Sequence, residues 1–130
     1  MPATASKTAT STKPSIRILY GESDEKTLAT HAAEIKSAGH QVTTALHRKG
    51  VLEQLGKDKE KYDLVILGST LSKDDRHHLP YMVKKTTQGT KVLIMHAAAR
   101  HHEVDAVVDS GMSMIFLLEK IAAVVHPAKR

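Results

Sequence analysis

Three short polar stretches of the sequence contain the residues whose types could do chemistry. Residues 22–25 are Glu, Ser, Asp and Glu, and such acidic clusters supply oxygen ligands to divalent cations. Residues 68–70 are Gly, Ser and Thr, which could offer backbone N–H groups and hydroxyls to a phosphate. Position 96 holds a histidine, the residue type suited to proton transfer near neutral pH. Cation binding, phosphate binding and proton transfer are therefore the candidate chemistries.

Each stretch also has a simpler interpretation, which we prefer for the acidic cluster and the histidine and hold equal for residues 68–70. Acidic residues in the first turn of a helix complement the positive end of the helix dipole. Mg²⁺ is usually held by more than one anionic group, whereas only Glu22 is well placed for a pocket and position 68 has no acid. Gly68 also suits a tight turn, and a lone histidine in a cleft most often fills space. We therefore predict no catalytic residue.

Two histidine pairs, His77–His78 and His101–His102, could join His96 around a Zn²⁺ or Cu²⁺ ion. Adjacent residues on a helix point about 100° apart, and the sequence contains no HxxxH or HxH spacing. We therefore predict no metal site and no cofactor.

The residues between these stretches predict alternating strands and helices. The expected strands are residues 15–20, 40–46, 63–67, 90–95 and 112–116. The expected helices are residues 24–39, a short helix around 51–55, one starting near Leu79, and residues 101–110 and 118–126. Right-handed crossovers then give an α/β fold, a (βα)5 three-layer sandwich with a five-stranded parallel sheet in the order 2-1-3-4-5. Residues 21–24, 68–72 and 96–100 follow strands 1, 3 and 4 and should meet at the fold's own site.

The composition fits one domain with an ordinary core. The chain has 130 residues, of which 41% are hydrophobic. Residues 1–14 are rich in Ala, Ser and Thr and predict a disordered N-terminal leader. Residues 15–126 form the expected domain, and residues 127–130 form a C-terminal tail.

Charge, cysteine content and hydropathy argue against several functional classes. The net charge is +5, but four cations lie in the two tails, and residues 15–126 contain 15 basic and 14 acidic residues. With three Tyr, one Phe and no Trp available for base stacking, nucleic acid is not an expected partner. The absence of Cys suits a cytoplasmic location. No apolar run reaches the roughly 18 residues of a membrane span, so no membrane association is expected.

The order of elements resembles the response-regulator receiver domain over residues 15–126, through pattern more than identity. Four segments carry the likeness. They are RILYGESDE, YDLVILGSTLS, KVLIMHAAA and DSGMSMIFLLEK, which are similar to the segments around the family's first, third, fourth and fifth strands. The resemblance implies a receiver-like, flavodoxin-like fold and a role in two-component signal transduction.

The resemblance also places the family's phosphorylation residues on positions that lack their chemistry. The acidic pair falls on Glu22 and Ser23, and the phosphoaccepting Asp falls on Gly68. The Ser/Thr position falls on His96, and the Lys position falls on Leu118. These five residues form the expected degenerate phosphorylation pocket of a pseudo-receiver, a protein that keeps the fold and has lost phosphotransfer.

A second resemblance, to flavodoxins, gives the alternative hypothesis of a degenerate FMN-binding protein. ILYGESDEKT is similar to the flavodoxin phosphate loop, with Ser23 and Thr27 at hydroxyl positions. However, Glu22, Asp24 and Glu25 would repel a phosphate, and residues 68–78 and 96–102 hold no Trp or Tyr to stack on a flavin. The receiver resemblance is therefore preferred.

We expect a stand-alone, non-enzymatic pseudo-receiver that acts by phosphorylation-independent protein–protein interaction. The expected partner is a signalling protein, or a second copy of the chain, bound through the fourth helix, the fifth strand and the last helix. The candidate residues of that face are Val104, Val108, Met112, Met114 and Phe116. The apolar fifth strand motivates this expectation, because edge strands are normally blunted by charge, although core packing accounts for most of its apolar character.

Overall fold

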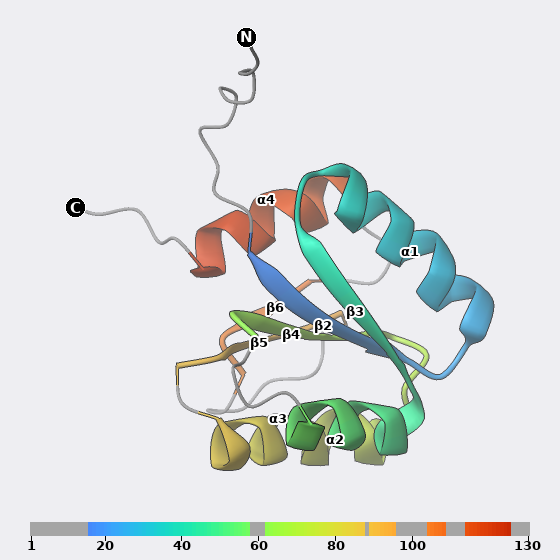
Figure 1. The fold of residues 1–130 in the computed structure, drawn as a ribbon, viewed down its shortest axis with the longest axis vertical. Helices are drawn as coiled ribbons and strands as arrows, with labels where there is room; N and C mark the ends of the chain where they lie inside the picture. Colours follow the sequence, from blue (N-terminus) through green and yellow to red (C-terminus); the bar gives the residue numbers. More distant parts are fainter. Residues whose placement is uncertain (1–15, 58–61, 88, 96–103, 109–113, 126–130) are drawn as a thin grey trace, which may run out of the picture.

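A computed structural model describes residues 16–57, 62–87, 89–95, 104–108 and 114–125 of the chain. Its strands are β2 (Arg17–Glu22), β3 (Gln41–Leu46), β4 (Leu64–Leu67), β5 (Lys91–Ile94) and β6 (Ala106–Val107). Its helices are α1 (Glu25–Ser37), α2 (His47–Lys57), α3 (Lys73–Thr86) and α4 (Met114–Val125). The strands form one sheet in the order β3-β2-β4-β5-β6, and every neighbouring pair is parallel (Figure 1). The predicted fold class and strand order are confirmed.

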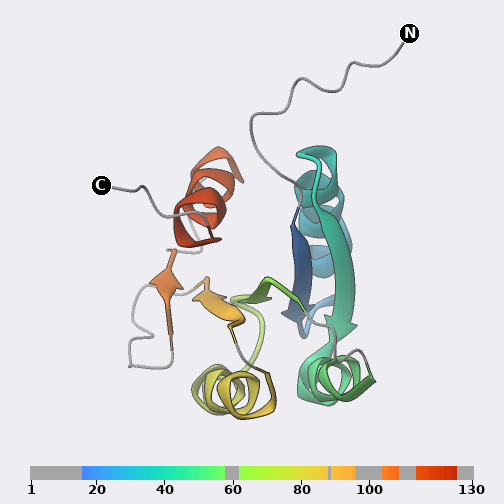
Figure 2. The same cartoon turned by 60° about the vertical axis from the view of Figure 1, so that its left-hand side comes forward.

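Helices cover both faces of the sheet (Figure 2), and a separate hydrophobic cluster fills each interface. Strand β4, LVIL, is fully buried because its side chains point alternately into the two clusters. On one face, α1 and α4 contribute Leu28, Ala32, Ile35, Leu117 and Ile121. On the other face, α2 and α3 contribute Val51, Leu55, Leu79 and Val83.

The third helix begins earlier than the sequence predicts. Its N-cap is Ser72, whose hydroxyl accepts a hydrogen bond from the Asp75 backbone N–H at 3.1 Å, and Asp74 and Asp75 lie in the first turn. Pro80 therefore lies inside α3 rather than in its first turn. The prediction of a start near Leu79 relied on the missing N–H of proline. Burial of Leu79 and Val83 against the sheet outweighs that local cost.

The last part of the chain differs most from the prediction. Residues 114–116, predicted as the end of the fifth strand, are the first turn of α4, and the fifth strand is Ala106–Val107. Those two residues pair with Leu93 and Ile94, so the predicted helix at 101–110 is wrong over residues 104–108. The β-branched residues in VDAVV favour a strand.

Helical spacing explains why the apolar run that follows is a helix. Leu117 and Ile121 are four residues apart and fully buried, and Met114, Leu118 and Val124 pack beside them in the same core cluster. A continuous apolar run does not distinguish strand from helix by periodicity alone. None of the helices in the described ranges is long and apolar enough to cross a membrane.

Candidate functional site

The carboxyl ends of β2 and β4 bring Glu22 and Gly68 together. The two strands are adjacent and parallel, with Gly21 paired to Leu67. The next residue on each strand is therefore Glu22 on one and Gly68 on the other, and the Gly68 N–H donates to the Gly21 carbonyl at 2.8 Å. The sheet edge predicted to hold the site does place these two candidate residues side by side.

The side chain of Glu22 occupies the space next to Gly68 that a side chain there would need. A Cβ atom built on Gly68 would lie 1.8 Å from Cδ of Glu22 and 2.0 Å from each of its carboxylate oxygens. Real Cβ atoms do not make contacts this short, and Glu22 itself is 0% exposed. Glycine at position 68 is therefore a packing requirement of the buried carboxylate.

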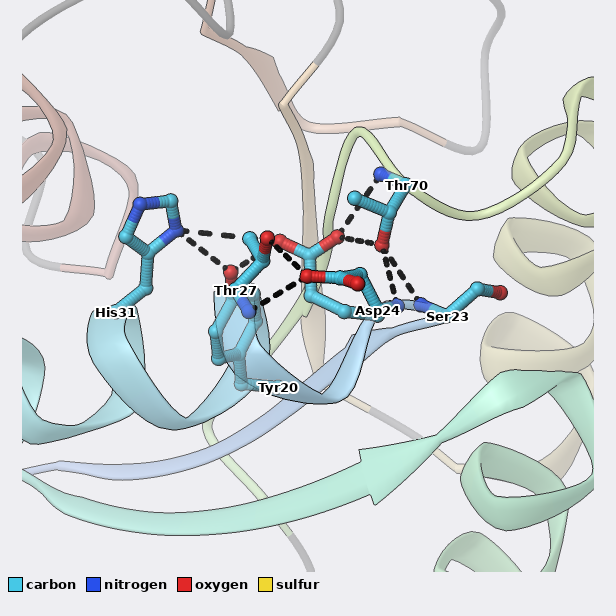
Figure 3. Close-up of polar contacts among 7 residues, drawn as sticks. Tyr20, Ser23, Asp24, Thr27, His31 and Thr70 are labelled. Carbon is cyan, nitrogen blue, oxygen red and sulfur yellow. Dashed lines mark hydrogen bonds and ion pairs between the residues drawn. The ribbon is translucent and has the colours of Figure 1, made fainter.

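Thr70 satisfies one carboxylate oxygen of Glu22. Oε1 of Glu22 accepts hydrogen bonds from the Thr70 backbone N–H at 2.9 Å and from its hydroxyl at 2.6 Å. The same hydroxyl oxygen accepts from the backbone N–H groups of Ser23 at 2.7 Å and Asp24 at 3.0 Å (Figure 3). One proton and both lone pairs of the hydroxyl are thus used. Thr70 ties the β4–α3 loop to the start of α1.

Tyr20 and His31 satisfy the other carboxylate oxygen. The Tyr20 hydroxyl donates to Oε2 of Glu22 and lies 3.0 Å from Nδ1 of His31. Since a hydroxyl has one proton and Tyr20 gives it to Glu22, His31 must donate through Nδ1 to complete the second contact. His31 Nδ1 also lies 4.0 Å from Oε2 of Glu22, and the His31 side chain is 31% exposed. A hydrogen-bonded chain therefore runs from the partly exposed His31 through Tyr20 (Figure 3) to the buried carboxylate of Glu22.

The electrostatics of the chain hold Tyr20 in its neutral form. Burial raises the pKa of the Tyr20 hydroxyl far above its usual value, and the hydrogen bond to Glu22 raises it further. A phenol in this position remains a hydrogen-bond donor throughout the physiological range of pH.

The carboxylate of Asp24 has a different role from that of Glu22 and makes no contact with the buried network. As the N-cap of α1, its carboxylate accepts from the Thr27 N–H at 2.9 Å and the Thr27 hydroxyl at 2.6 Å. These two bonds lower the pKa of the Asp24 carboxyl. The interpretation of this acid as a helix-terminal residue is confirmed. The described ranges contain no group of three or more His, Asp or Glu side chains placed to hold a metal ion.

The loop of residues 68–72 is held by the protein's own groups. The Thr70 N–H, a candidate phosphate donor, is bonded to Glu22. Arg76 reaches back from α3 and donates through Nη1 to the carbonyls of Ser69 at 3.2 Å and Leu71 at 2.8 Å. Both donors of Thr70 are therefore directed inward to the Glu22 carboxylate, and two carbonyls of the loop are bonded to Arg76.

The remaining predicted site residues lie away from the Glu22 network or outside the described residues. Leu118, assigned to the family's Lys position, lies within α4 and packs on the core, so it does not stand at a strand end. His96 and Met112 lie outside the described residues. Of the proposed partner face, Val108 is 2% exposed, Val104 and Met114 are half-buried, and Phe116 is 36% exposed.

Tyr20 and His31 were not among the predicted site residues. Tyr20 is two residues before Glu22 on the same strand, so both side chains point to the face that α1 covers. That alternation was a usable signal. His31 could be placed only once the packing of α1 on β2 was known.

Comparison with solved structures identifies the fold. A CheY-like receiver domain protein from Methanospirillum hungatei has a TM-score of 0.73 at 20% identity, covering 86% of this chain and 94% of that one. A Francisella response regulator receiver domain gives 0.72 at 17% identity, covering 88% and 99%. The response regulator TrrA from Thermotoga maritima, in complex with Mg²⁺ and beryllium fluoride, gives 0.71 at 20% identity, covering 83% and 97%.

At these identities the likeness shows a shared fold, the CheY-like arrangement of five parallel strands and flanking helices. No protein-family model matches the sequence, and no curated protein matches it significantly.

Proposed function

We propose that this protein is a non-enzymatic signalling module with a receiver fold, acting through protein–protein interaction without phosphorylation. One observation carries the proposal. The carboxylate of Glu22 fills the space at the end of β4 where the resemblance places the phosphoaccepting Asp. Gly68 offers no side-chain oxygen, and the neighbouring acid is buried and bonded rather than open to a cation.

Opening this site to a cation would be energetically costly. Mg²⁺ prefers several oxygen ligands in octahedral geometry. To reach it, Glu22 would have to leave its hydrogen bonds with Thr70 and Tyr20. A hydrogen bond to a charged group contributes about 1.5–3 kcal/mol, so releasing three of them opposes binding. This cost supports a module in which Glu22 keeps its hydrogen bonds and does not turn outward to bind a cation.

Helix α4 is the surface we assign to the partner. Only Glu119 and Lys120 are charged among its twelve residues, and Phe116 is one of two large hydrophobic side chains exposed in the described ranges. Exposed apolar side chains on a helix are a common docking feature. We therefore assign the proposed partner face to α4, which carries Met114 and Phe116, rather than to an edge strand.

The flavin alternative gains no support from the site. The Thr27 hydroxyl, one of its expected phosphate donors, donates to Asp24, and the Ser23 N–H donates to Thr70. A phosphate would have to replace both interactions beside the buried Glu22.

The phosphorylation-independent part of the proposal is tested by amide NMR. Labelled protein is titrated first with Mg²⁺ and then with beryllofluoride, and the amides of residues 21–24 and 68–70 are followed. We expect no beryllofluoride-dependent shifts at these positions. Saturable shifts there would overturn the proposal. A receiver domain with a complete acidic site provides the positive control.

The interaction part is tested by site-specific crosslinking in cells. A photoreactive phenylalanine is placed at position 116 in α4 and, as the control, at position 81, where Tyr81 is 48% exposed on α3. We expect a discrete crosslinked protein from position 116 only. Equal or absent crosslinking at the two positions would contradict the assignment of α4 as the docking helix.

A further inference from the structure

The two edge strands of the sheet differ in length, and the proposed function involves neither of them. The edge strand β6 has two residues, a common way to limit strand pairing. The other edge strand, β3, has six residues and pairs with β2 without interruption from Gln41 to Leu46. Within the described part of the chain, no strand pairs with the outer side of β3.

Strand β3 lacks the features that normally protect an exposed edge. Its sequence, QVTTAL, contains no charged residue, no proline and no glycine, and its unbroken register leaves no bulge. Helices α1 and α2 lie over its two faces and leave the outer side of the strand facing outward (Figure 2). The side chains of Gln41 and Thr44 are exposed. Such an edge presents unpaired backbone donors and acceptors to another strand.

Helix α1 offers a matching surface above this edge. His31 contacts Tyr20 on β2, so its side of the helix faces the interior of the sheet. Ala29 and Ala33 lie about 160° around the helix from His31, which places them toward the outer side of β3. Both are exposed, and their small side chains allow a second helix to approach closely.

Charged residues of both signs lie near the two alanines, and one of them, Lys26, lies about 160° around the helix from the buried Leu28 and so faces away from the sheet. Glu25 lies in the first turn of α1 and Lys36 in the last. Both fall within about 40° of Ala29 around the helix. When two copies of α1 run antiparallel about a centre near position 31, Glu25 of each copy lies beside Lys36 of the other.

We propose that the occupant of this edge is a second copy of the chain, with β3 pairing antiparallel to its twofold mate and α1 packing beside the mate's α1. The uncharged strand brings no like charges together in such a pair, and its central threonines can face each other across the strands. In the antiparallel α1 pair, twofold symmetry gives two contacts, each between Glu25 of one copy and Lys36 of the other. An unrelated extended peptide would satisfy the edge but would not use the complementary ends of α1.

This dimer is separate from the α4 surface, and sedimentation velocity over a concentration series tests it. Wild-type protein should show a monomer–dimer equilibrium. Thr44→Lys places a charge on the edge strand and should raise the dissociation constant of the dimer roughly tenfold or more. A tenfold change corresponds to about 1.4 kcal/mol. Thr30→Lys changes another exposed Thr, about 100° around α1 from Ala29, and as the matched control it should leave the equilibrium unchanged.

A charge exchange identifies the α1 contact. Glu25→Lys should weaken the dimer, and the double variant Glu25→Lys/Lys36→Glu should restore it. Glu34→Lys makes the same change on another side of α1, about 140° from Ala29, and should have no effect. Circular dichroism verifies that each variant is folded.

Three outcomes would overturn the proposal. They are a wild-type monomer at all concentrations, a dimer insensitive to Thr44→Lys, and a dimer lost on Phe116→Lys, which would place the contact on α4.

Discussion

The carboxylate of Glu22 lies where the side chain of residue 68 would begin, with Cδ only 1.8 Å from the Cβ position on Gly68. An acid on one strand and the absence of a side chain on the next are therefore two parts of one arrangement. The acid missing from the end of β4 is replaced in space by one from the end of β2. Residues 22 and 68 should consequently respond to mutation as a unit.

Gly68→Ala should lower the free energy of unfolding by about 2–4 kcal/mol, because the new methyl group displaces Glu22 from its hydrogen bonds. Urea unfolding measures the change. Gly56→Ala in α2 is the control, since a Cβ there meets nothing within 4 Å and should stabilise the helix by about 0.5–1 kcal/mol.

The double variant Glu22→Ala/Gly68→Ala tests whether the two residues are coupled. Without the carboxylate the clash disappears, so the double variant should lose clearly less stability than the sum of the two single variants. Additive losses would show that Gly68 is required for another reason, such as its backbone conformation.

Thr70→Val should destabilise the protein by about 2–4 kcal/mol. The substitution keeps the side chain's shape but removes the donor to Glu22 and the acceptor for the Ser23 and Asp24 N–H groups. Buried polar groups left without partners cost about 1–3 kcal/mol each. Thr70→Ser retains the hydroxyl and should cost much less. Similar losses for both variants, measured by urea unfolding, would attribute the effect to packing of the methyl group.

The first four strands of the sheet could be predicted from the sequence because their patterns are local. Residues 64–67 form a short, fully apolar run directly after Asp63, and Asp24 and Gly39 mark the two ends of α1. Parallel order followed from the alternation of strands and helices. These signals require no knowledge of which side chains meet.

The last third of the chain could not be assigned in the same way. MSMIFLLEKIAAVV is apolar at nearly every position, so neither a period of two nor one of 3.6 stands out. Pairing in the sheet decides between strand and helix for this run. Strand β5 pairs with Ala106–Val107, so the later run is free to form a helix, which packs on the same face of the sheet as α1. The candidate site was limited in the same way. Position 68 was identified, but the Glu22 side chain that fills its space depends on packing between strands.

Substitutions in α4 distinguish the observed helix from the predicted strand. Leu117→Ala should cost about 2–5 kcal/mol because this side chain is 2% exposed within the core. Phe116→Ala should cost under about 1 kcal/mol, as its ring is at the surface with Lys120 over it. If residues 112–116 formed a strand, every second side chain of that segment would be buried, and the strand would end before Leu117. A larger loss for Phe116→Ala than for Leu117→Ala would therefore contradict the helix.

The stability of the protein should fall at alkaline pH through Tyr20. A phenol in the unfolded chain loses its proton near pH 10, whereas burial and then the Glu22 contact raise the pKa of Tyr20 in the folded protein. Above about pH 10 the unfolded state therefore binds fewer protons than the folded state, and linkage makes the free energy of unfolding decrease with pH. The contribution is fully present below that pH and is lost as the pH rises toward the folded-state pKa. Its slope is about 1.4 kcal/mol per pH unit.

Tyr20→Phe isolates this contribution, because all other titrating groups are common to the two proteins. The variant should be less stable at neutral pH by about 1–3 kcal/mol, since Glu22 and His31 each lose a hydrogen-bond partner. Its urea midpoint should then fall less steeply than that of the wild type between about pH 9.5 and 11, where the phenol of an unfolded chain titrates. Parallel curves over that range would mean that the Tyr20 hydroxyl titrates equally in both states, and that it is not held neutral by the buried carboxylate.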